Sequence, residues 1–214
     1  MKRIFFPLLL SVASLAAEIK TVQLTWDSAQ CNESCQSLVQ RRFKQSPDVM
    51  QAEVGPGSLI LTWKPNRPFS WTAVRQPMQS VGLGINSTQV TVRGTVIRAG
   101  EKIFLNSLGD NTRFELTSPP APRAGQFIEY NNTTLYKLSP DLLAKFTQAA
   151  EKKQVVTATG YLLMPWRIAL TLIVGQYHIE GAEVAPTVVP GQGPNANPPT
   201  NQTNPPQQVP YKRY

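Results

Sequence analysis

The sequence contains few of the residues that most often carry chemistry, with two cysteines and one histidine among 214 residues. A single histidine excludes a metal cluster built from several histidines, and two cysteines allow at most one intramolecular disulfide. No spacing of Ser, His and Asp, and no pairing of carboxylates, indicates a catalytic site. After the N-terminal segment, no apolar run is long enough to cross a membrane. We therefore expect a protein that is not an enzyme and has no transmembrane segment.

The N-terminus is typical of a secretory signal peptide. Lys2 and Arg3 precede an almost unbroken apolar run over residues 4–15, and small residues stand at Ser14 and Ala16. About a dozen apolar residues cannot span about 30 Å of hydrocarbon, so we interpret residues 1–16 as a signal peptide and not as an anchor. The mature protein is expected to be exported, either to a periplasm or out of the cell.

The charge of the chain indicates a solvated basic surface. Removal of Lys2 and Arg3 takes two charges from the formal net charge of +8, and the remaining basic residues are scattered along the sequence. A nucleic-acid footprint would gather basic residues on one face and place aromatic residues between them. We expect no nucleic-acid partner.

The C-terminal residues 184–214 are dominated by Pro, Asn, Gln, Gly and Thr. Such a segment has too few apolar side chains to offset the entropy of ordering, so we expect a disordered tail. Its Pro-Pro pairs favour extended segments, which are suited to bind a partner protein of the cell envelope or cell-wall material. The alternative is a flexible tail without a specific ligand, and the sequence leaves both open, together with the oligomeric state.

Residues 18–92 are expected to form a first domain. Alternating apolar residues predict strands over residues 19–27, 49–54, 58–63 and 89–92, and helical spacing predicts helices that begin near Cys35 and after Ser70. Pro77 lies inside the second helical pattern and should kink that helix or restrict it to two short turns. The order strand, helix, strand, strand, helix, strand is that of the ferredoxin-like βαββαβ fold.

Residues 93–183 are expected to form a second, β-rich domain. Its predicted elements are strands over residues 90–96, 102–105, 112–117, 154–163 and 168–179, a short strand at 127–128, and a helix that opens at Pro140. Five strands with a helix between the third and fourth, and the spacing of Val and Gly over residues 90–96 and 156–162, resemble the OB-fold barrel. This resemblance implies binding of nucleic acid, sugar, peptide or no small ligand.

Three residues of this second domain are candidate binding residues. Phe104 and Phe114 are the aromatic candidates for stacking on a base, although strand alternation makes both of them equally good core residues. His178 is interpreted as a surface or hydrogen-bonded residue, with a ligand role as the weaker alternative.

Cys31 and Cys35 are where the sequence indicates chemistry. They are separated by three residues, between the end of the first predicted strand and the start of the first predicted helix. A helix N-terminus stabilises a thiolate, and an exported protein favours pairing of its cysteines. Three interpretations stay open: a structural disulfide, a soft-metal site and a redox-active pair.

The first domain resembles the heavy-metal-associated domain of copper chaperones, metal-pumping ATPases and the periplasmic mercury-binding protein. The resemblance rests on the strand residues Thr21, Val22 and Leu24, the loop Cys31, the helix start Cys35 with residues 37–39, and a strand at 59–62. It implies that Cys31 and Cys35 bind a soft ion such as Cu(I). Members of that family carry Cys-x-x-Cys preceded by Met, whereas this chain has one more residue between the cysteines and Ala29 in place of the Met.

The sequence therefore predicts an α+β protein with a ferredoxin-like βαββαβ domain, a small OB-like β-barrel and a disordered tail. Its expected function is exported, non-enzymatic binding of a soft metal ion through Cys31 and Cys35. The alternative is an envelope structural or interaction protein with a Cys31–Cys35 disulfide and no metal.

Overall fold

The computed structural model describes residues 19–120 and 135–181. The predicted signal peptide, the predicted tail from residue 184 and the predicted strand at 127–128 lie outside these residues. Within them the chain is a mixed α+β fold with three α-helices, one 3-10 helix and eight strands. None of these helices has the length and apolar character needed to cross a membrane.

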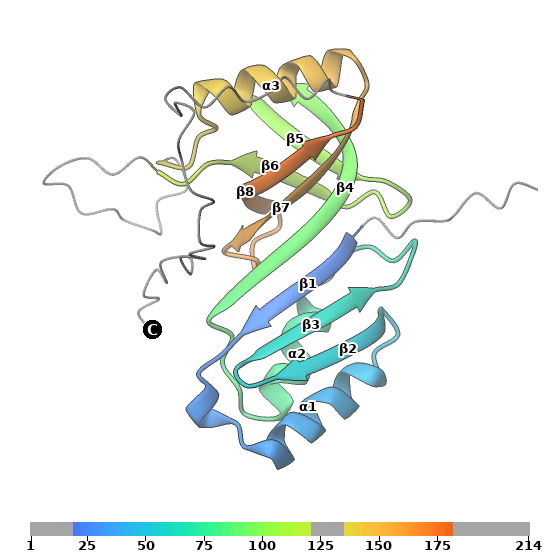
Figure 1. The fold of residues 1–214 in the computed structure, drawn as a ribbon, viewed down its shortest axis with the longest axis vertical. Helices are drawn as coiled ribbons and strands as arrows, with labels where there is room; N and C mark the ends of the chain where they lie inside the picture. The colour runs from blue at the N-terminus through green and yellow to red at the C-terminus, as the bar shows by residue number, and fades with distance from the viewer. Residues whose placement is uncertain (1–18, 121–134, 182–214) are drawn as a thin grey trace, which may run out of the picture. The chain divides into compact units, whose positions relative to one another are not determined.

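The first four strands form an antiparallel sheet in the order β2-β3-β1-β4 (Figure 1). Their bounds are Ile19–Thr25 (β1), Val49–Gly55 (β2), Ser58–Trp63 (β3) and Ser87–Ala99 (β4). Strands β2 and β3 form a hairpin, and Gly57 has a φ of 69° in its turn. Glycine suits this position because a side chain disfavours the left-handed region.

Alternation along these strands separates an apolar face from a polar one. Val22 lies opposite Leu61 and Leu24 opposite Leu59, and all four are fully buried. The residues between them on β1 and β3 point to the other face because the side-chain period of a strand is two. That other face is largely polar; in β1 it carries Thr21, Gln23 and Thr25.

Two helices supply the other side of this core. Helix α1 (Glu33–Lys44) buries Val39 and Phe43, and helix α2 (Trp71–Ser80) buries Val74 and Met78. The predicted cap of α2 is confirmed, since Ser70 Oγ accepts a hydrogen bond from Ala73 N at 3.2 Å.

Both helices depart in detail from the sequence prediction. Helix α1 begins before Cys35, because Asn32 is its N-cap and accepts a hydrogen bond from Cys35 N at 3.0 Å. Helix α2 runs through Pro77 and is not divided into two short turns. Proline removes one backbone donor, and burial of Val74 and Met78 on either side of that turn offsets the loss.

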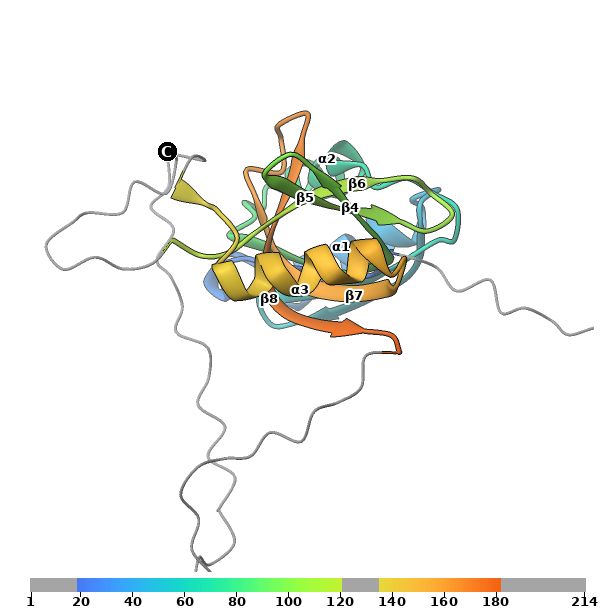
Figure 2. The same cartoon turned by 90° about the horizontal axis from the view of Figure 1, so that it is seen from above.

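The C-terminal half is a closed five-stranded barrel in the order β4-β5-β6-β8-β7 and back to β4. Its further strands are Lys102–Ser107 (β5), Arg113–Thr117 (β6), Val155–Leu163 (β7) and Leu170–Ile179 (β8). The β6–β8 pair is parallel and the other pairs are antiparallel. Helix α3 (Pro140–Glu151), capped by Ser139, lies over one end of the barrel (Figures 1 and 2).

Strand β4 belongs to both halves. Along one edge its residues 87–92 pair with β1 and residues 94–99 pair with β5, while residues 89–95 pair with β7 on the other edge. The predicted border between residues 92 and 93 falls inside this strand. The two predicted domains therefore share a strand and one continuous hydrophobic core.

Candidate functional site

The loop that carries the cysteines is built by two short capping interactions. After β1, Asp27 caps a 3-10 helix, Ser28–Gln30 (η1), by accepting a hydrogen bond from Ala29 N at 3.1 Å. Cys31 N then donates to Ser28 O at 3.3 Å, and Asn32 starts α1. Asp and Asn are favoured at these positions because their side chains satisfy backbone N–H groups that the helix leaves free.

Cys31 and Cys35 are joined in a disulfide, with their Cα atoms 5.2 Å apart. Cys31 is 4% exposed and belongs to the hydrophobic core, while Cys35 is partly buried and packs against that core. The bond thus fixes the first turn of α1 to the loop that follows β1. Of the two sulfurs, that of Cys35 belongs to the more exposed residue.

The structure brings together both residues that the sequence singled out, and it does so as the disulfide that was one of the open interpretations. A disulfide sulfur offers no thiolate, which is the form that binds a soft metal ion. In the described ranges no group of three His, Cys, Asp or Glu residues is placed to hold a metal ion. Ala29, at the position of the family's Met, lies in η1 and is exposed. Metal binding by the reduced pair stays a prediction.

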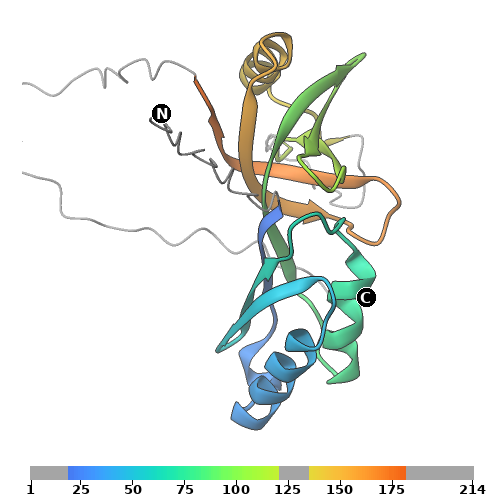
Figure 3. The same ribbon diagram turned by 90° about the vertical axis from the view of Figure 1, so that its right-hand side faces the viewer.

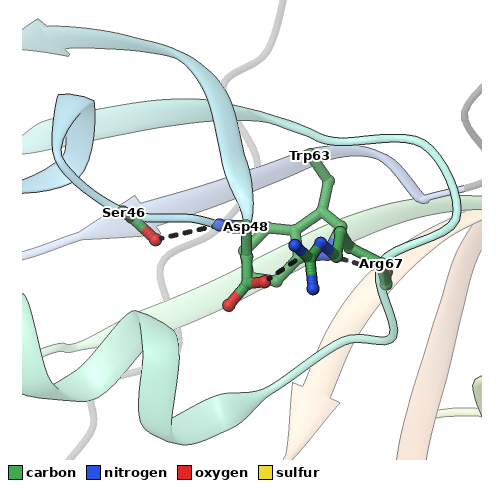
Figure 4. Close-up of polar contacts among 4 residues, drawn as sticks. All are labelled: Ser46, Asp48, Trp63 and Arg67. Atoms are coloured by element: carbon green, nitrogen blue, oxygen red, sulfur yellow. Dashed lines mark hydrogen bonds and ion pairs between the residues drawn. The ribbon is translucent and has the colours of Figure 1, made fainter.

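The opposite end of the first sheet is fastened by polar contacts around Asp48 (Figure 4). Asp48 N donates to Ser46 Oγ at 3.4 Å, and the Asp48 carboxylate lies 4.0 Å from Arg67 Nε. Trp63 Nε1 donates to Arg67 O at 3.0 Å. These contacts hold the loop between β3 and α2 in place, and we assign them a structural role.

That loop connects the first sheet to the barrel through Phe69. Its ring centroid lies 5.5 Å from that of Trp63 and 6.4 Å from that of Phe114 on β6. Phe69 N also donates to Thr112 Oγ1 at 2.9 Å, in a buried hydrogen bond. The contacts explain why Phe114 is fully buried, which assigns this aromatic candidate to the core.

Phe104 lies on the outer surface of the barrel and is covered by a cation. The Arg113 guanidinium stacks 3.7 Å from the centroid of its ring, and a Lys102–Glu115 ion pair of 2.9 Å lies on the same pair of strands. Arginine stacking on an aromatic face is a common surface arrangement. A base would have to displace Arg113 before it could stack on Phe104.

His178 is exposed on β8, opposite Thr157 of β7. Its neighbourhood contains a bidentate contact between Arg93 and Glu180, in which Arg93 Nε and Nη2 donate to the carboxylate at 2.7 and 3.0 Å. The hydrogen bonds from Arg93 hold the pKa of Glu180 below its ordinary value, with smaller contributions from the charges of His178 and Lys20. The group fastens the end of β8 to β4 across β7.

A cavity of about 380 Å³ lies between α2 and the loop that joins β7 to β8. Its wall includes Trp71, Arg75 and Gln79 of α2 and Trp166 of the loop. The sequence prediction missed this site, because its two walls come from segments that are distant in the sequence, and Trp71 also packs against the hydrophobic core. The readable signal was the spacing of Trp71, Arg75 and Gln79, which are four residues apart and therefore share one face of a helix.

No family model, curated protein or solved structure matches this chain. The resemblances described from its motifs therefore stay proposals, and the function has to be argued from the chain's own geometry.

Proposed function

We propose that this chain is an exported, non-enzymatic binding protein of the cell envelope whose Cys31–Cys35 pair is a disulfide. The observation that carries the proposal is the disulfide itself, which pairs both cysteines of the sequence. Disulfides persist in oxidising compartments and are rare in the cytosol of most organisms. The apolar segment over residues 4–15 supports the same compartment.

We also propose that the first half is a ferredoxin-like unit and the second an OB-like barrel. The strand order β2-β3-β1-β4 with α1 and α2 in the connections supports the first assignment. The barrel order, its parallel β6–β8 pair and the place of α3 between β6 and β7 support the second. Because side chains fill the barrel core, a ligand would bind on its outer surface or at its loops. The tail from residue 184 is proposed as the segment that binds an envelope partner.

The second candidate is soft-metal binding by the reduced pair. The disulfide favours it in one respect, because it shows that the two sulfur atoms can meet at the start of α1. After reduction the two thiolates would have to move apart to hold a two-coordinate soft ion such as Cu(I) between them, and the helix N-terminus would stabilise them. This candidate requires a reducing partner to open the disulfide first.

The state of the cysteines in exported protein distinguishes the two candidates. The full chain, expressed with its own N-terminus in a bacterial host, would be recovered from the periplasm without reductant and treated with a thiol alkylating reagent. We expect a mature N-terminus at Ala17 and no alkylated cysteine by mass spectrometry. Protein that stays in the cytoplasm would contradict export, and two alkylated cysteines would contradict the disulfide.

The same preparation tests the metal candidate after reduction. Metal binding predicts one Cu(I) per chain, taken from a coloured Cu(I) chelator, and loss of that uptake in Cys31→Ser. Ser37→Ala, two residues after Cys35 in α1, is the matched control and should leave uptake unchanged. No uptake by the reduced wild-type protein would end the metal candidate and leave the disulfide as the role of the pair.

A further inference from the structure

The cavity between α2 and the β7–β8 loop is lined by two segments of the chain. The chain brings two distant segments to it, since residues 71–85 form one wall and Trp166 forms the other. Figure 3 shows the orange β7–β8 loop and the green helix α2 on the same side of the protein. A volume of about 380 Å³ lies within the range of small-ligand pockets, which is about 300–1,000 Å³.

Helix α2 lines this cavity with the exposed residues Arg75 and Gln79 and with Trp71, which also packs against the core. Val74 and Met78 are fully buried in the core, which leaves Trp71, Arg75 and Gln79 along the cavity. The segment after the helix adds the apolar side chains of Leu83 and Ile85. The wall therefore combines aromatic and aliphatic surface with two side chains that donate hydrogen bonds.

Trp166 stands at the tip of an anchored loop. Met164 is buried against Tyr136 and Leu163, and Arg167 N donates to Met164 O at 3.0 Å, which closes a turn around Trp166. Trp166 as a whole residue is 65% exposed. An exposed Trp at the rim of a cavity offers a flat aromatic surface on which a ligand can stack.

The positive charge at the site favours a ligand with a negative charge. Arg75 is the one ionisable side chain among the described residues that line the cavity, and no carboxylate in the described ranges forms an ion pair with it. A guanidinium recognises a carboxylate through two parallel hydrogen bonds. Gln79, one turn further along the helix, has an amide that both donates and accepts, as recognition of a hydroxyl group requires.

We propose that this cavity binds an acidic saccharide, with a pyranose ring stacked on Trp166 and its carboxylate on Arg75. One face of a pyranose carries C–H groups that pack flat on an indole ring, while its hydroxyl groups meet Gln79. An acidic sugar satisfies the stacking surface, the cation and the amide together, whereas a purely apolar ligand would leave Arg75 and Gln79 without partners. The inference rests on the proposed export, because it names the ligand class of that binding protein.

The test uses the purified, disulfide-bonded protein and two sugars that differ in whether their carboxyl groups are free or methyl-esterified. Trigalacturonic acid is the probe and its methyl ester is the uncharged control, with binding followed by tryptophan fluorescence and isothermal titration calorimetry. We expect the acid to bind at least about tenfold more tightly than the ester, since a charge-assisted hydrogen bond is lost on esterification. Arg75→Gln should bring the two affinities together, and Trp166→Ala should abolish binding of both.

Two control variants keep the test specific. Ile168→Ala alters a fully exposed side chain in the same loop, and Arg98→Gln removes a cation that does not line this cavity. Both should bind the acid as the wild type does, and all four variants should keep the wild-type unfolding temperature. The proposal is overturned if the acid does not bind or if Trp166→Ala still binds it. It is also overturned if decaproline, a stand-in for a Pro-rich peptide ligand, displaces the acid and binds more tightly.

The outcome is independent of the export experiment. Sugar binding is measured on purified protein, whereas export and the disulfide are read from the mature N-terminus and from alkylation. Loss of the charge preference would therefore reject the ligand class without touching the proposed compartment, and cytoplasmic retention would reject the compartment without touching the measured affinity.

Discussion

At the scale of single residues, two glycines make the barrel possible. A Cβ added to Gly94 of β4 would collide with the backbone oxygen of Asn106, and one added to Gly160 of β7 would collide with that of Ile173. Both obstacles are backbone atoms of a paired strand, so they cannot turn away as the end of a flexible side chain can. Gly94 also lies where one edge of β4 passes from β1 to β5.

Gly94→Ala is therefore expected to lower the free energy of unfolding by about 1–3 kcal/mol, as overpacking against fixed backbone does. The measurement is urea unfolding followed by tryptophan fluorescence. Gly84→Ala is the matched control, because no atom lies within 4 Å of its added Cβ and its φ is not in the left-handed region. A loss of less than about 0.5 kcal/mol in Gly94→Ala would show that β4 and β5 move apart freely.

Residue-scale reasoning from the sequence located Cys31 and Cys35 at the correct junction of strand and helix. It could not choose among the states of the pair, because spacing alone does not say whether two sulfurs meet. It also missed the cap at Asn32, although Asn before an acidic residue is a readable start of a helix. Nothing in the sequence indicated that Trp166 lines a cavity, because the facing wall comes from α2, about 90 residues away in sequence.

At the scale of elements, the Arg93–Glu180 contact ties the end of β8 to β4. Both carboxylate oxygens of Glu180 accept hydrogen bonds from Arg93, and Glu180 N donates to Val155 O at 2.9 Å. Because the hydrogen bonds favour the ionised carboxylate, the pKa of Glu180 is lowered in the folded protein from its ordinary value of 4.5. A lowered folded-state pKa contributes stability above the unfolded-state value, and that contribution is lost as pH falls through the folded value.

Glu180→Gln should consequently destabilise the protein more at pH 7 than at pH 3. The comparison is the difference in free energy of unfolding between wild type and variant, measured by urea at each pH. Glu101→Gln, which replaces an exposed carboxylate that takes part in none of the ion pairs of the described residues, should show little dependence on pH. Equal differences for Glu180→Gln at both pH values would mean that the contact with Arg93 does not persist in solution.

At the scale of the whole described unit, the order of strands and helices was predictable, but the joining of the two halves through β4 was not. Local alternation predicted β3 with its observed bounds, and Ser70 before a helical pattern predicted the start of α2. Both features depend on neighbouring residues. The sharing of one β4 edge between β1 and β5 depends on pairings between distant segments. The buried hydrogen bond between Phe69 and Thr112 is likewise non-local, since it joins residues 43 positions apart.

The shared strand and continuous core predict that the described unit unfolds in one step. Phe69→Ala should lower the free energy of unfolding by about 3–4 kcal/mol, because the ring is 9% exposed and its loss leaves a cavity between Trp63 and Phe114. Hydrogen exchange should show equal loss of protection in β3 and in β6, on the two sides of that contact. Met50→Ala, at a side chain that is 60% exposed on β2, is the control and should change stability by less than about 0.5 kcal/mol. If β3 lost protection while β6 kept it, the two halves would be separate folding units. The border predicted between residues 92 and 93 would then separate two parts of β4 that unfold independently, although the strand is continuous.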